Sequence, residues 1–151
     1  MKVKEIMKKE VITVGPETKL VEAIKVMFKS RVSGLPIVNV RGMLVGILSE
    51  KDAFRSLHPS YKEYYENPES FTDFEKMERE AIKRIKHLKV KQAMSREMIT
   101  ASLGTPILKV GALMLAKGIH RVPVIGKDRK LLGIVTRRDI YRGIFRKTFD
   151  L

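Results

Sequence analysis

The sequence predicts an α/β fold built from two copies of a β-α-β-β-α unit, each a small mixed sheet with helices packed on it. Shifting the chain by 87 positions superposes its two halves without a gap. Each half also contains two short apolar runs around a turn, then a Ser or Thr followed by an acidic residue, which indicates two strands and a capped helix. A gapless match of this length indicates an internal duplication, so we expect two pseudo-two-fold-related repeats.

The repeats are defined by identical residues at equivalent positions. The most informative pairs under the shift of 87 are Met7 with Met94, Pro36 with Pro123, Gly46 with Gly133, Asp52 with Asp139, and Arg55 with Arg142. We therefore expect a first repeat over residues 1–57 and a second repeat over residues 90–151. Residues 58–89 have no counterpart and are expected to form a structured helical insertion.

Each repeat opens with a predicted strand and an amphipathic helix. Residues 11–14 form a β-branched run that ends at Gly15-Pro16, which indicates a strand. Thr18 is the expected N-cap of the helix that follows, and Thr105 with Pro106 is expected to begin its counterpart. The predicted buried faces of these helices are Leu20, Ala23, Ile24, Met27 and Phe28, and Ile107, Val110, Gly111, Met114 and Leu115.

The second half of each repeat is predicted to be a hairpin and a helix. The turns are expected at residues 41–42 and 127–130, and the final helices are expected to begin after Ser49 and Thr136. In the insertion, Thr72 and Glu75 have the spacing of a capping box before a helical apolar stripe. The insertion is predicted to cover the junction of the repeats, or to form a dimer contact or a lid.

Composition narrows the classes of function. The 151 residues include 31 Lys and Arg, 17 Asp and Glu and no Cys, which gives a net charge of +14. The absence of Cys excludes thiol nucleophiles, thiolate metal sites and disulfides. The positive charge favours anionic partners, although a generally basic surface explains it equally well. The beginning of the chain lacks the apolar region of a signal peptide, and no apolar run could cross a bilayer, so a cytoplasmic protein without a membrane partner is expected.

The repeats resemble the CBS domain, a family named after cystathionine β-synthase. The resemblance rests on residues 12–14 and 99–101, on residues 118–124, and on the two hairpin ends at residues 46–52 and 133–139. Paired CBS domains are called a Bateman module. The resemblance implies a free-standing module that binds adenine nucleotides or S-adenosyl compounds in clefts between the repeats and regulates a partner protein.

The resemblance also implies a main ligand site in the second repeat. Asp139 is expected to bind the ribose hydroxyls and Thr136 the ribose or phosphate, whereas His120 and Arg121 resemble a pair that contacts phosphate. An ionised carboxylate accepts both hydrogen bonds of a cis-diol, and a guanidinium suits phosphate. The same Thr and Asp also form a helix N-cap, and the two roles are compatible. The full predicted set is Thr100, Ala101, Ile119, His120, Arg121, Val122, Pro123, Thr136, Arg138 and Asp139.

A second site is implied at the equivalent positions of the first repeat. This repeat has Val32, Ser33, Gly34 and Leu35 where the second has Ile119 to Val122, so it lacks the matching cations. We therefore expect the Asp139 site to be the stronger of the two. The full second set is Thr13, Val14, Val32, Ser33, Gly34, Leu35, Pro36, Ser49, Lys51 and Asp52.

Three classes of function follow from these features. The first is a non-catalytic regulatory module that binds AMP, ADP, ATP or an S-adenosyl compound, forms a homodimer of paired repeats and acts on an unidentified protein target. The alternative is a basic nucleic-acid-binding or protein-interaction scaffold with the same fold, in which aromatic residues of the insertion stack on bases. An enzyme is not expected, because the three histidines lack metal-ligand spacing and no phosphate loop or nucleophile elbow is present. No metal or required cofactor is expected.

Overall fold

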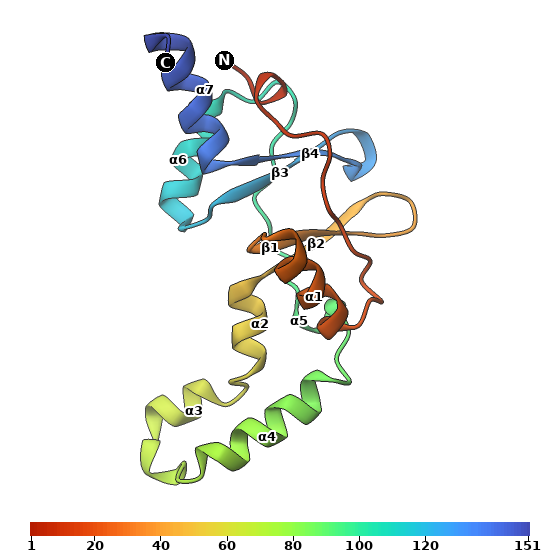
Figure 1. Ribbon diagram of the computed structural model, residues 1–151, viewed down its shortest axis with the longest axis vertical. Coiled ribbons are helices and arrows are strands. Elements are labelled where there is room, and N and C mark those ends of the chain that lie inside the picture. Colours follow the sequence, from red (N-terminus) through yellow and green to blue (C-terminus); the bar gives the residue numbers. More distant parts are fainter. The chain divides into compact units, whose positions relative to one another are not determined.

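Figure 1 shows the computed structural model, which describes all 151 residues of the chain. Its two sheets are small hairpins, and every other regular element is a helix or a short 3-10 turn. In chain order the elements are η1 (Val3–Glu5), α1 (Leu20–Ser30), β1 (Gly34–Val38), β2 (Leu44–Ser49), α2 (Glu50–Ser56), α3 (Tyr61–Glu66), η2 (Pro68–Ser70), α4 (Phe74–Ile85), α5 (Val90–Ala93), α6 (Ile107–Lys117), β3 (Arg121–Ile125), η3 (Lys127–Arg129), β4 (Leu131–Thr136) and α7 (Arg137–Phe149).

The chain forms two compact units whose boundaries differ from those of the sequence repeats. Unit 1 comprises Met1–Thr13, Val38–Val45 and Glu97–Leu151, and unit 2 comprises Val14–Ile37 and Gly46–Arg96. We call residues 1–8 and 88–95 the first and second opening segments, because they begin the two repeats at equivalent positions. The first opening segment packs with the second repeat, and the second opening segment packs with the first. The repeats have therefore exchanged their opening segments.

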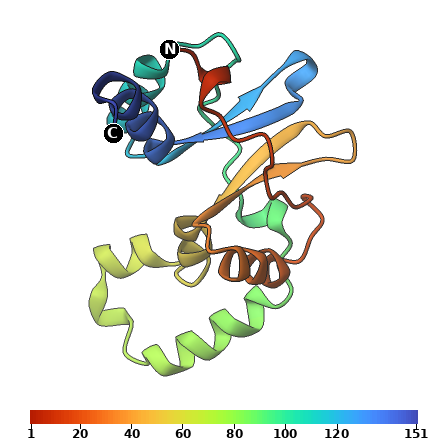
Figure 2. The same cartoon turned by 45° about the horizontal axis from the view of Figure 1, so that its top comes forward.

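Unit 1 is built on the antiparallel pair β3–β4. Arg121 lies opposite Thr136 and Pro123 opposite Ile134 in this pair, and Ala101 adds a parallel bridge to Val124. The first opening segment runs beside β4 (Figure 2). The backbones of Lys8 and Ile134 exchange two hydrogen bonds of 2.9 Å there. The core is apolar and consists of Val3, Ala101, Ile107, Val110, Met114, Val122, Val124, Val135 and Ile140.

Unit 2 repeats this arrangement with α1, most of β1 and β2, and α2. Val14 forms a parallel bridge to Ile37, which corresponds to the bridge from Ala101 to Val124. The backbones of Ile47 and Ser95 exchange two hydrogen bonds of 3.0 and 2.9 Å, the counterpart of the pair formed by Lys8 and Ile134. The predicted fold class is confirmed, with two related α/β units.

The predicted strand at residues 11–14 is reduced to the single bridge at Val14, because no other residue of this run pairs with a neighbour. The predicted caps Thr18 and Thr105 are also wrong. The N-cap residues are Lys19 and Pro106, and neither has a capping side-chain hydrogen bond. The opening segments supply backbone partners instead: Leu20 N–H donates to the Leu88 carbonyl in unit 2, and the equivalent Ile107 N–H donates to the Met1 carbonyl in unit 1.

The caps predicted at Ser49 and Thr136 are confirmed, and each forms a complete capping box. Two residues assigned to buried helix faces are instead exposed, Phe28 by 81% and Leu115 by 78%. The insertion consists of α3, η2 and α4 within unit 2 (Figure 2). The N-cap residue of α4 is Asp73, whose side chain accepts the Lys76 N–H, and not the predicted Thr72. No helix has both the length and the apolar character needed to cross a membrane.

Two equivalent glycines allow the opening segments to approach the hairpins. A Cβ on Gly133 would lie 2.6 Å from the carbonyl oxygen of Lys8, and one on Gly46 would lie 2.5 Å from Met94 Sδ. Neither distance is sterically acceptable. Glycine at these positions is thus a condition for the exchange of opening segments.

We expect Gly133→Ala to destabilise the protein by about 1–3 kcal/mol, because the added methyl group meets backbone, which adjusts less readily than a side chain. Gly104→Ala is the matched control, since a Cβ added there would have nothing within 4 Å. It should change stability by less than about 0.5 kcal/mol. Urea unfolding followed by circular dichroism measures both. Equal stability of the two variants would contradict a tight contact at Gly133.

Candidate functional site

Asp139 lies in the first turn of α7, where it completes the cap formed by Thr136. The Asp139 Oδ2 accepts the Thr136 N–H at 2.8 Å and the Thr136 hydroxyl at 2.7 Å. The other oxygen, Oδ1, has one partner, Lys8 Nζ at 3.7 Å, and the Lys8 side chain is 63% exposed. One carboxylate oxygen is therefore fully used by the cap, whereas the other retains acceptor capacity.

The hairpin brings other predicted residues of the main site to the same end of the sheet. Arg121 begins β3 opposite Thr136, and the Arg137 N–H donates to the His120 carbonyl at 2.9 Å. The Arg137 guanidinium also contacts His120 Nδ1. His120 and Arg138 are exposed, so both are accessible to a charged ligand.

The remaining residues of the predicted main set lie deeper in unit 1. The Ala101 N–H donates to the Pro123 carbonyl at 2.9 Å, which places residues 100–101 beside β3. Val122 and Pro123 are buried, and Ile119 packs against the core. The Val122 side chain serves the core, so its contribution to a ligand would come from its backbone.

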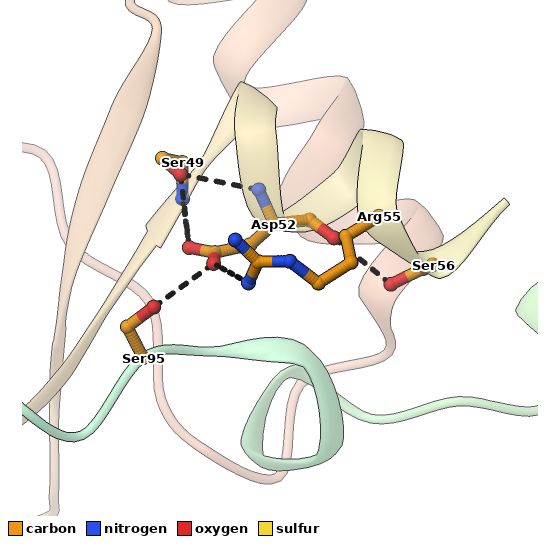
Figure 3. Close-up of polar contacts among 5 residues, drawn as sticks. All are labelled: Ser49, Asp52, Arg55, Ser56 and Ser95. Atoms are coloured by element: carbon orange, nitrogen blue, oxygen red, sulfur yellow. Dashed lines mark hydrogen bonds and ion pairs between the residues drawn. The ribbon is translucent and has the colours of Figure 1, made fainter. Parts of the chain in front are cut away.

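The equivalent carboxylate in unit 2, Asp52, is only 4% exposed and is surrounded by protein donors (Figure 3). Its Oδ2 accepts the Ser49 N–H and hydroxyl, both at 2.9 Å. Its Oδ1 accepts the Ser95 hydroxyl at 2.9 Å and Arg55 Nη1 at 3.3 Å. Both oxygens of Asp52 are therefore engaged within the protein.

The other predicted residues of the second site are divided between the units. The Glu50 N–H donates to the Ser33 carbonyl at 2.9 Å, which corresponds to the bond between Arg137 and His120. Gly34, Leu35 and Pro36 are buried in β1, Val14 and Val32 are half-buried, and Lys51 is exposed. Thr13 belongs to unit 1, whereas the other nine residues belong to unit 2.

Sequence reasoning missed Lys8 and Ser95, which come from the opening segments. These two residues are equivalent under the shift of 87, and each directly follows a repeated methionine. Lys8 approaches Asp139 and Ser95 binds Asp52, so each carboxylate is contacted by the opening segment of the other repeat. Their equivalent positions were visible in the alignment of the halves, but the exchange that brings them to the carboxylates was not.

No group of three or more His, Asp or Glu side chains is arranged to hold a metal ion. Hydrogen bonds from Lys89 and Lys91 lower the pKa of Glu17 to about 2. This cluster ties the region before α1 to the second opening segment in unit 2. Glu17 is thus a structural contact, outside the candidate sites.

Comparison with known proteins finds the same duplication. The family model for the CBS domain matches residues 3–59 and 90–146. The uncharacterized protein MJ1426 of Methanocaldococcus jannaschii is 32% identical over 155 residues, covering 95% of this chain and 91% of that protein. Inosine-5'-monophosphate dehydrogenase of the same organism is 30% identical and is matched over 93% of this chain, which spans only 23% of the enzyme's length.

Solved structures of CBS domain pairs have the same fold as this chain. The CBS domain pair of protein MJ0100, in complex with 5'-methylthioadenosine and S-adenosyl-L-methionine, has a TM-score of 0.72 and 29% identity over 98% of each chain. CBSX2 from Arabidopsis thaliana has a TM-score of 0.76 and 23% identity, covering 97% of this chain and 95% of that one, and so supports the fold alone. The two matched repeats, the relative of similar length and the shared architecture establish that this chain belongs to the CBS domain family.

Proposed function

We propose that this chain is a non-catalytic regulatory module that binds one adenosine-containing ligand through Asp139. The observation that carries the proposal is the state of the carboxylate: Oδ2 is used by the cap, and Oδ1 has only a distant, exposed lysine as partner. An ionised carboxylate accepts two hydrogen bonds from a ribose cis-diol and donates none. The MJ0100 pair, at 29% identity, is bound to two adenosyl compounds, which supports this ligand class.

The rest of the ligand would use neighbouring groups of unit 1. His120 and Arg121 supply cationic or donor groups beside Thr136, and Arg138 adds an exposed charge in the first turn of α7. The helix N-terminus favours an anion at the same place. Thr100, Ala101, Ile119, Val122 and Pro123 would form the adenine side. This arrangement suits AMP, ADP, ATP or an S-adenosyl compound, and it requires no cofactor.

The Asp52 site is proposed to be structural in this protein. Its carboxylate already accepts bonds from Ser49, Ser95 and Arg55 and is almost fully buried. A ribose would have to break several of these bonds to gain two of its own. We therefore propose one ligand per chain, in the second repeat.

We propose a regulatory role because the chain would bind a ligand but has no recognisable set of catalytic residues. Relatives named as enzymes, such as the dehydrogenase, are about four times longer than the part matched here, since that part is 23% of their length. A ligand changes the population of the arrangement that it binds best, and a protein target would respond to that arrangement. Non-catalytic action on a partner protein is accordingly part of the proposal.

A homodimer is proposed from apolar side chains that the units leave exposed. Phe28 and Leu115 occupy equivalent positions in α1 and α6, with exposures of 81% and 78%. Phe54 and Tyr141 are equivalent in α2 and α7, with exposures of 64% and 63%. Large apolar groups repeated on the helices of both units are typical of an interaction surface. A second copy presents the same groups, so the contact would be self-complementary.

We expect Asp139→Ala to weaken binding of the best adenosyl ligand about a hundredfold, because two charge-assisted hydrogen bonds are lost. Isothermal titration with AMP, ATP, S-adenosylmethionine and methylthioadenosine measures affinity and stoichiometry, and the wild type should bind one ligand per chain. Glu97→Ala, an exposed carboxylate of unit 1, is the control. Unchanged affinity in Asp139→Ala would contradict the ribose role, and two ligands per chain would contradict a closed Asp52 site.

The two carboxylates should also differ in their effect on stability. Asp52→Ala is expected to cost about 2–4 kcal/mol, because it leaves several buried or half-buried donors without their acceptor. Asp139→Ala should cost only about 1 kcal/mol, since it chiefly removes a helix cap. Urea unfolding without ligand compares them. Equal losses would mean that Asp139 is as structural as Asp52.

For the dimer, we expect the double variant Phe28→Glu with Leu115→Glu to be monomeric, because charges buried at an interface without partners oppose association. Val40→Glu is the control, as Val40 is fully exposed in the turn between β1 and β2 and lies outside the helices. Sedimentation equilibrium gives the mass of each. A monomeric wild type, or a double variant that remains dimeric, would contradict a dimer through these helices.

A further inference from the structure

A hollow in unit 1 lies along α7 and extends beyond the residues that the adenosine proposal uses. It is a largely open depression with a volume of about 590 Å³. Its lining includes two carboxylates, Glu5 and Asp139, and three cations, Arg142, Arg146 and Lys147. His120, Arg121 and Arg138 are not among its lining residues. The hollow thus has cations of its own.

Close packing of the first opening segment on α7 forms the apolar part of this hollow. A Cβ on Gly143 would lie 2.9 Å from Ile6 Cγ2, so glycine is needed for this approach. Ile6 and Met1 therefore supply an apolar wall beside the cationic face of α7. A hollow with one apolar wall and one charged wall differs from the evenly solvated face expected for a basic helix on the surface.

The two arginines of the hollow are not engaged within the protein. Arg142 and Arg146 form none of the ion pairs or side-chain hydrogen bonds of the chain. They are four residues apart on α7, a spacing that puts their side chains on one face about 5–6 Å apart at Cβ. Each guanidinium can bind phosphate oxygens through two parallel N–H groups. The pair, with Lys147 beside it, matches a ligand that carries more than one phosphate.

The hollow also contains two carboxylates, Glu5 and Asp139, which offset part of its positive charge. Glu5 Oε2 accepts the Lys2 N–H at 2.6 Å, which is the main reason that the pKa of Glu5 is lowered, and the charge of Lys147 acts in the same direction. Asp139 is partly compensated by Lys8 and by two donors of Thr136. Arg142 and Arg146 are not ion-paired with either carboxylate, and the lining holds three cationic side chains against two carboxylates.

Comparison of the repeats indicates that Arg146 and Lys147 are not needed for the fold. The equivalent of Arg142 is Arg55, which binds Asp52 at 3.3 Å. The equivalents of Arg146 and Lys147 are Pro59 and Ser60, which carry no charge. Unit 2 forms the same hairpin and capped helix without counterparts of Arg146 and Lys147. The cationic hollow is therefore particular to the second repeat.

We propose that this hollow binds a polyphosphate chain, held by Arg142, Arg146 and Lys147. The bound polyphosphate is either a free inorganic polyphosphate or the tail of a nucleotide whose ribose reaches Asp139. A single phosphate would leave part of the cationic set unused, and two or more would engage it. The site does not depend on the adenosine proposal, because none of the three cations belongs to the predicted adenosine set.

Titration calorimetry at low ionic strength with tripolyphosphate, ATP and AMP tests the proposal. We expect the wild type to bind tripolyphosphate and the double variant Arg142→Gln with Arg146→Gln to bind it about tenfold or more weakly. The control is Lys109→Gln with Lys117→Gln, which removes two exposed positive charges from α6 outside the hollow. It should retain the wild-type affinity.

The nucleotides identify the source of the phosphates. If the chain belongs to a nucleotide, ATP binds more tightly than AMP, and the double arginine variant removes that difference. If it is free polyphosphate, ATP shows no advantage while tripolyphosphate still binds. Asp139→Asn should weaken the binding of AMP but not the binding of tripolyphosphate. A failure of the adenosine proposal would therefore leave the tripolyphosphate result unchanged. Absence of both tripolyphosphate binding and an ATP advantage, or an equal loss in the lysine control, overturns the polyphosphate site.

Discussion

The structure depends on the exchange of opening segments between the repeats. In unit 1 the backbone of Lys8 is bonded to β4 at Ile134, and in unit 2 the backbone of Ser95 is bonded to β2 at Ile47. The same segments supply carbonyl partners to the first N–H groups of α6 and α1. A helix whose first donors find backbone partners does not need a capping side chain, which is why Thr18 and Thr105 are not caps. Backbone contacts between segments far apart in the sequence thus take the place of the capping side chains that the local sequence predicts.

The exchange also determines which side chain reaches each carboxylate of the duplicated scaffold. Position 8 is lysine and position 95 is serine, although both follow a methionine. The short serine hydroxyl comes within 2.9 Å of Asp52, whereas the lysine ammonium stays 3.7 Å from Asp139 and is mostly exposed. One scaffold therefore yields a carboxylate with both oxygens hydrogen-bonded in unit 2, and a carboxylate that is 12% exposed and has one weakly paired oxygen in unit 1. The difference arises in the opening segments and in the arginine three residues after each aspartate, since Arg55 pairs with Asp52 whereas Arg142 forms no ion pair with Asp139.

Much of the fold could be predicted from the sequence because duplication doubles the evidence for each element. The hairpins and the caps at Ser49 and Thr136 follow from local patterns that both repeats contain, and they are confirmed. Local patterns failed where long-range contacts decide the structure. Residues 11–14 have strand propensity but pair only at Val14, and Phe28 and Leu115 fit a buried helical face but lie in solvent. Helical periodicity alone does not distinguish burial within a unit from burial by another molecule.

At the candidate site, too, local patterns did not predict the long-range contacts. The energies of those contacts explain why they matter for ligand binding. The motif identified Asp139 and Asp52 as equivalent, but their partners differ, and a ligand must compete with those partners. In the ion pair between Lys8 and Asp139 the lysine side chain is 63% exposed and the aspartate side chain 12% exposed, and the charged atoms are 3.7 Å apart. A pair with one partner in solvent is weaker than a buried one. The Asp52 network is buried, and each of its bonds to a charged group is worth about 1.5–3 kcal/mol. The two equivalent motifs of the duplicated chain therefore differ in the hydrogen bonds that a ligand would have to displace.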